Sequence, residues 1–230
     1  MEVEPPYFKM GISWWGKRGL WDNFLHMNAL GSGVVNILRQ VWRVVRWPIG
    51  ILAALYVGLV IYELFHLPKV TAATIAAIHA QRLTMADADG KHLPPQPDPK
   101  LVDATVEGID ANKNGVRDDV ELAIFKKYPN DAKIRAAELQ YAMDQQMYLT
   151  LVINTETWKA AAVQLDRGYQ CIAGTYPRDD LNKLNIVTNM RTSEVETLQY
   201  NTAARKLKRE DVSKNITSYG LSDGDYCDVM

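Results

Sequence analysis

Apolar residues are concentrated in one continuous run near the amino-terminal end of the chain. Residues 48–65 read PIGILAALYVGLVIYELF and include a single charged side chain, Glu63. With the residues that flank it, this run forms an α-helix roughly 30 Å long, which matches the hydrocarbon core of a bilayer. We therefore predict a transmembrane helix over residues 48–67.

A helical pattern precedes this run. Between residues 34 and 47, apolar side chains recur on one arc of a helix, and Arg39, Arg43 and Arg46 gather on the opposite arc. The pattern predicts a basic amphipathic helix that either lies on the inner leaflet of a membrane or docks on a membrane partner. Residues 1–47, which also contain Trp14, Trp15 and Trp21, are interpreted as a cytoplasmic or interfacial region.

Two short segments follow the predicted span. Residues 68–90 are interpreted as a juxtamembrane helix, because the stretch from Thr71 to Met85 is rich in alanine and Pro68 permits a kink before it. Residues 91–100, KHLPPQPDPK, are rich in proline and predict an extended linker. Such a linker would hold an outer domain away from the bilayer.

Helical patterns also dominate residues 101–230, and no alternation typical of strands is visible. The fold class is therefore mainly α, with a single transmembrane helix and a small extracytoplasmic helical domain. Acidic residues precede the first outer helix, and Ser193 and Glu196 have the spacing of a capping box that opens the last. The predicted outer helices cover residues 120–127, 131–152, 156–174, 180–190 and 193–209.

The charges that flank the span indicate its orientation. Arg39, Arg43 and Arg46 lie just before it, whereas Lys69 is the nearest base after it. The positive-inside rule then predicts a cytoplasmic amino terminus and an extracytoplasmic outer domain. A cleaved signal peptide is the competing interpretation, but the long leader and the length of the apolar run favour an uncleaved signal anchor.

Composition removes several classes of function. A net charge of −1 argues against nucleic-acid binding. No nucleotide-binding glycine pattern occurs, and no histidine follows His92, so a Ser/His or Cys/His hydrolase and an identifiable small-molecule substrate are not indicated. The basic run from Arg205 to Arg209 is interpreted as a solvated helix end.

The two cysteines, Cys171 and Cys227, both follow the predicted span. They lack the spacing of zinc ligands or redox motifs, and disulfides persist in extracytoplasmic compartments. We therefore predict a disulfide between them that holds the carboxy-terminal tail.

One short segment carries recognisable chemistry. Residues 110–121, DANKNGVRDDVE, fit the spacing D-x-[DN]-x-[DN]-G-x5-E, which brings side-chain oxygens and one carbonyl around a calcium ion. Gly115 supplies the sharp turn. A solvated Asn/Gly turn is the alternative interpretation. The predicted Ca²⁺ ligands are Asp110, Asn112, Asn114, Val116 through its carbonyl, Asp118 and Glu121.

This loop resembles that of EF-hand proteins and the thrombospondin type 3 calcium loops. The stretch from Gly108 to Glu121 also resembles bacterial envelope proteins in which GIDxNxNGVRDDVE opens a small helical domain with a late cysteine pair. Two features differ from a paired EF-hand: Arg117 stands where an apolar residue usually pairs with a second loop, which the chain lacks, and residues 99–109, bracketed by Pro99 and Gly108, predict no entering helix. The resemblance implies a bacterial inner membrane protein with a periplasmic carboxy-terminal domain.

Together these features predict a non-catalytic, membrane-anchored module that contacts membrane lipid and docks on a partner protein in an envelope complex. Calcium is expected to have a structural role. The alternative function is a calcium-stabilised extracytoplasmic hydrolase or carbohydrate-active enzyme.

Overall fold

The computed structural model describes residues 32–221 and 224–229. The roles expected for Trp14, Trp15 and Trp21 lie outside these residues. Helices joined by turns make up the described residues, and no strand occurs among them, which confirms the mainly α prediction. The chain divides into two compact units, Met1–Glu63 and Leu64–Met230, which we describe separately.

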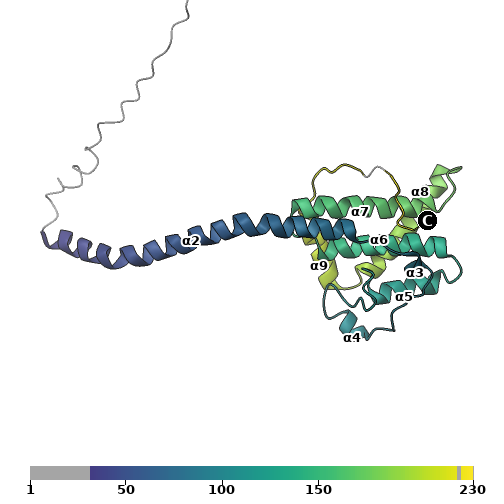
Figure 1. Ribbon diagram of the computed structural model, residues 1–230, viewed down its shortest axis with the longest axis horizontal. Coiled ribbons are helices and arrows are strands. Elements are labelled where there is room, and N and C mark those ends of the chain that lie inside the picture. Colours follow the sequence, from purple (N-terminus) through teal and green to yellow (C-terminus); the bar gives the residue numbers. More distant parts are fainter. Residues whose placement is uncertain (1–31, 222–223, 230) are drawn as a thin grey trace, which may run out of the picture. The chain divides into compact units, whose positions relative to one another are not determined.

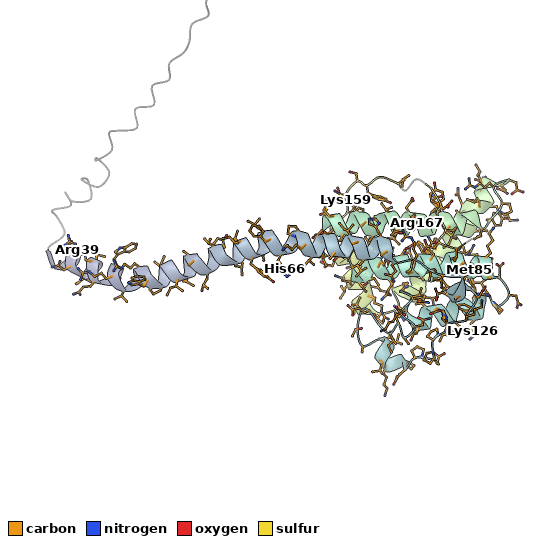
Figure 2. All side chains as sticks on the ribbon, in the orientation of Figure 1. Arg39, His66, Met85, Lys126, Lys159 and Arg167 are labelled. Carbon is orange, nitrogen blue, oxygen red and sulfur yellow. A yellow bond between two sulfur atoms is a disulfide. The ribbon has the colours of Figure 1, made fainter. Side chains whose placement is uncertain are left out.

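The described part of the first unit is helical and belongs to α2, which extends over Ser32–Ala80. Its apolar side chains, including Leu52, Leu55 and Tyr56, are exposed. Figure 2 shows side chains projecting on both sides of this helix. Among the described residues, α2 alone is long and apolar enough to cross a membrane. The helix is therefore compatible with a single-pass membrane protein, and its orientation remains a prediction.

The boundaries that we expected around the span are absent. One continuous helix replaces the separate segments predicted at 34–47, 48–67 and 68–90, and it ends at Ala80. Pro48 and Pro68 both lie inside α2. Each removes only one backbone donor, and apolar helices tolerate such a loss. The chain then turns, and α3 (Met85–Ala88) begins after Thr84, whose side chain and backbone both bond Asp87.

The second unit is built around α6 (Ala132–Thr150), as Figure 1 shows. This helix packs against α3, α5 (Asp118–Lys127), α7 (Thr155–Gly174), α8 (Leu181–Gln199) and α9 (Ala203–Ser213). A short helix, α4 (Pro99–Val102), precedes the loop that leads to α5. Helices at 118–127, 132–150 and 155–174 agree closely with the sequence prediction.

The compact unit begins earlier than the predicted boundary at residue 101. Ile78, near the end of α2, is fully buried, and Leu83 joins it in the core. Pro94 and Pro97 are also buried, so the proline-rich segment packs on the helical unit instead of forming a free spacer. The juxtamembrane and linker segments are therefore parts of this unit.

The division between the last two helices also differs from the prediction. Helix α8 continues through Ser193, where we expected a new helix to begin, and α9 begins after Thr202, whose hydroxyl accepts from the Arg205 backbone N–H. The reason lies in the core: Arg191 is buried within α8 and donates to Glu138 of α6 at 2.7 Å. This buried ion pair fixes the middle of α8 against α6.

A disulfide joins Cys171 of α7 to Cys227 of the tail, as predicted. The tail is also held by Arg167 of α7, labelled in Figure 2, which donates to the Asp228 carboxylate at 2.9 Å. Gln140 of α6 exchanges hydrogen bonds with the backbone of Tyr226 and Asp228. The carboxy-terminal segment is therefore fixed to two helices.

Candidate metal site

The predicted calcium loop lies directly before α5, so that Asp118 and Glu121 occupy the first turn of this helix. Gly115 has a φ of +85°, which is the left-handed region where a side chain is disfavoured. A Cβ at this position would lie 1.6 Å from Nε2 of Gln81. The loop therefore needs glycine here for both its backbone angle and its close packing.

Three of the predicted ligands close the loop through hydrogen bonds to its backbone. The Asp110 carboxylate accepts from the N–H groups of Asn114, at 3.2 Å, and Gly115, at 2.8 Å. Asn114 Oδ1 accepts from the Val116 N–H at 2.9 Å. Asp118 Oδ1 accepts from the Ala111 N–H at 2.9 Å. These bonds involve both oxygens of Asp110 and one oxygen each of Asn114 and Asp118.

Two other predicted ligands, Asn112 and Glu121, are in direct contact. Asn112 Nδ2 donates to Oε2 of Glu121 at 3.0 Å and to the carbonyl of His92 at 2.7 Å. Glu121 and Val116 are both fully buried. The first turn of α5 and the start of the loop are therefore linked through the Asn112–Glu121 pair.

Several buried polar atoms of the loop have no partner among the described residues. They include two oxygens, Oδ1 of Asn112 and Oδ2 of Asp118, and one nitrogen, Nδ2 of Asn114. A buried polar atom without a hydrogen bond costs on the order of 1–3 kcal/mol. A cation inside the loop would supply a partner for the two oxygens.

The electrostatics of the loop point in the same direction. Burial raises the pKa of Glu121 to about 7, the Asn112 hydrogen bond opposes this rise, and the carboxylates of Asp87 and Asp110 add to it. Burial also raises the pKa of Asp118, and the charges of Asp110 and Asp119 contribute to that increase. Negative charge is therefore costly in this loop unless a cation compensates it.

The donor set is suited to a hard cation only when amides and a carbonyl are included. Among the described residues, no three His, Cys, Asp or Glu side chains are arranged to hold a metal ion by themselves. The loop instead combines three carboxylates with two amide side chains and the Val116 carbonyl. An all-oxygen set of this kind fits calcium.

Arg117, which stands where paired EF-hands usually have an apolar residue, connects the loop to α8. Its side chain is fully buried and donates to the carbonyl of Leu198 at 2.7 Å and to that of Gln199 at 3.2 Å. It also forms an ion pair with Asp119. The residue thereby caps the carboxy-terminal end of α8, where a basic group is favourable.

The basic run from Arg205 to Arg209 was interpreted as a solvated helix end. This is wrong for Arg205, which is fully buried. Its guanidinium donates to the carbonyls of Val106, at 3.0 Å, and Thr105, at 3.2 Å, and to Asp103 at 2.7 Å. It also bonds the Val102 carbonyl. Arg205 thus fastens the segment that enters the predicted calcium loop to α9. Its distant partners left no local signal in the sequence.

Comparison with known proteins yields no relative: no protein-family model, no curated protein and no solved structure matches this chain.

Proposed function

We propose that this protein is a membrane-anchored, calcium-binding module. The observation that carries the proposal is the loop of residues 110–121, where buried oxygens of Asn112 and Asp118 lack partners beside carboxyl groups whose pKa is raised. Such an arrangement is unfavourable without a cation and is stabilised by one. Residues 110–121 resemble an EF-hand or thrombospondin type 3 loop in spacing and residue type, which also supports calcium.

The proposed role of calcium is structural. The loop lies between two fixed points, because Arg205 holds the entering segment on α9 and Arg117 caps α8. A cation bound at the loop would therefore stabilise the packing of α5 against α8. The loop has no partner loop of the same pattern in the chain, which argues against the paired arrangement of a sensor.

The long apolar helix α2 supports an anchoring role. Arg39, Arg43 and Arg46 lie in the amino-terminal part of α2. We therefore propose a bacterial inner membrane location in which the helical unit is periplasmic. The module would contact membrane lipid through α2 and dock on an envelope protein. Purification from a mild detergent tests the docking: a stable companion is expected, and a lone chain would contradict it.

Calorimetric titration of the full chain in detergent with CaCl₂ tests the metal site. We expect a Kd of about 10⁻⁴ to 10⁻³ M, the range of extracellular calcium modules, and weaker binding of Mg²⁺, which dehydrates reluctantly. Glu121→Gln should abolish the calcium heat. Glu107→Gln, which changes an exposed acid near the loop, is the matched control and should bind normally. Equal calcium binding by both variants would disprove the site.

A further inference from the structure

A cavity of about 420 Å³ lies within the second unit, away from the calcium loop. Its walls come from α6, α7, α8, α9 and the tail. This volume is within the range of small-molecule sites. Six aromatic side chains line it: Tyr141, Tyr148, Trp158, Tyr169, Tyr200 and Tyr219.

Most polar groups of the cavity wall are already paired with one another. The Glu196 carboxylate accepts from the Tyr141 hydroxyl at 2.9 Å and from Arg209 at 3.0 Å. The Trp158 indole donates to the Tyr148 hydroxyl at 3.0 Å. A ligand with many hydroxyl groups, such as a sugar, would find few free partners here.

Two features remain available to a ligand. The first is aromatic surface, and the second is Asp166, a partly buried carboxylate that forms no ion pair among the described residues. The cavity wall also contains two carboxylates, Asp166 and Glu196, against the single guanidinium of Arg209. The charge of the cavity is therefore negative, which favours a cationic ligand.

The aromatic wall already accepts a cation within the protein itself. The guanidinium carbon of Arg209 lies 4.4 Å from the centroid of the Tyr200 ring. Positive groups are attracted to the faces of tyrosine and tryptophan rings, and the attraction grows as the site is shielded from water. Tyr200, Tyr148 and Trp158 are all nearly buried.

We propose that this cavity binds a small organic ammonium ion, with its apolar body against the aromatic rings and its charge beside Asp166. This site is separate from the proposed calcium loop and does not depend on it.

The outer wall of the cavity is supplied by the tail. The Tyr219 ring lies edge to face with Trp158, with centroids 5.6 Å apart, and Tyr219 is the most exposed of the six aromatic residues. The tail that carries Tyr219 is fastened further along by the disulfide at Cys227. We therefore expect the tail to complete the ammonium site.

Equilibrium binding to the full chain in detergent tests the proposal with three probes. Choline is the cation, 3,3-dimethylbutan-1-ol is its uncharged isostere, and glucose represents a neutral sugar. Because the isostere has the same shape, it separates charge from apolar burial. Choline should bind at least about tenfold more tightly than the isostere. Equal binding of the two, no choline binding, or tighter binding of glucose would each overturn the proposal.

Variants locate the site. Asp166→Asn should weaken choline binding by at least about tenfold, whereas Asp179→Asn, a change at an exposed acid outside the cavity, should leave it unchanged. Tyr219→Phe keeps the ring and should retain binding, and Tyr219→Ala should lose it. Thermal unfolding of each variant verifies its fold. Unchanged binding in Asp166→Asn would place the ligand elsewhere and refute the assignment.

Discussion

The charge of Glu121 provides a quantitative test of the loop in the absence of metal. Its pKa is about 7 in the folded protein, against an ordinary value of 4.5. Between these values the folded state binds more protons than the unfolded state, so stability falls as the pH rises. Below pH 4.5 both states are protonated, and above pH 7 the full loss is present.

The difference between the two pKa values corresponds to about 3 kcal/mol. Glu121→Gln removes the charge but keeps one oxygen that can accept from Asn112. Without calcium, this variant should therefore be more stable than the native protein above pH 7, by up to about 3 kcal/mol. At acidic pH the two proteins should be equally stable. The raised pKa of Asp118 acts in both proteins and largely cancels in the comparison.

Urea unfolding of the full chain in detergent and EDTA, followed by circular dichroism across a pH series, measures this difference. Calcium should then remove much of this difference. At ten to one hundred times Kd, bound ligand adds about 1.4 to 2.7 kcal/mol to the native protein and nothing to the variant. Parallel pH profiles of the two proteins in EDTA would refute the claim that charge at residue 121 is costly.

Three further changes test the surrounding framework. Cys227→Ser should lower stability by about 4 kcal/mol on the chain-entropy model, measured by urea unfolding, and reduction of the native protein should have the same effect. Arg117→Ala should cost at least about 2 kcal/mol because buried carbonyls of α8 lose their donor, while Lys126→Ala, at an exposed site on α5, should be neutral. Gly115→Ala should cost about 1–3 kcal/mol in thermal unfolding, because of its positive φ, and should weaken calcium binding; normal binding would show that the loop tolerates a side chain.

Sequence periodicity predicted a helix correctly where local signals mark its ends. Helix α7 has an apolar stripe and begins after Asn154, whose side chain caps it. The same reasoning failed at Ser193, because a capping-box pattern can also occur within a helix that tertiary packing sustains. There α8 continues, and Arg191, two residues before Ser193, packs in the core against Glu138.

The candidate loop was predictable in its residues but not in its attachments. Spacing alone brings Asp110, Asn112 and Glu121 into one segment. The burial of Arg117 depends on carbonyls about eighty residues away, and sequence spacing gives no indication of such a contact. The cavity likewise collects aromatic side chains from α6, from α7, from the end of α8 and from the tail, so no single segment displays it.

The burial of Ile78 and Leu83 has a practical consequence for producing a soluble fragment. A fragment cut after the proline-rich segment, beginning at residue 101, would discard both side chains and leave their apolar contacts on the core open to water. Each loss would cost about 1.5–3 kcal/mol, a large share of the stability of a small protein. A fragment that begins at Leu64 retains the whole compact unit and is the better candidate for crystallisation.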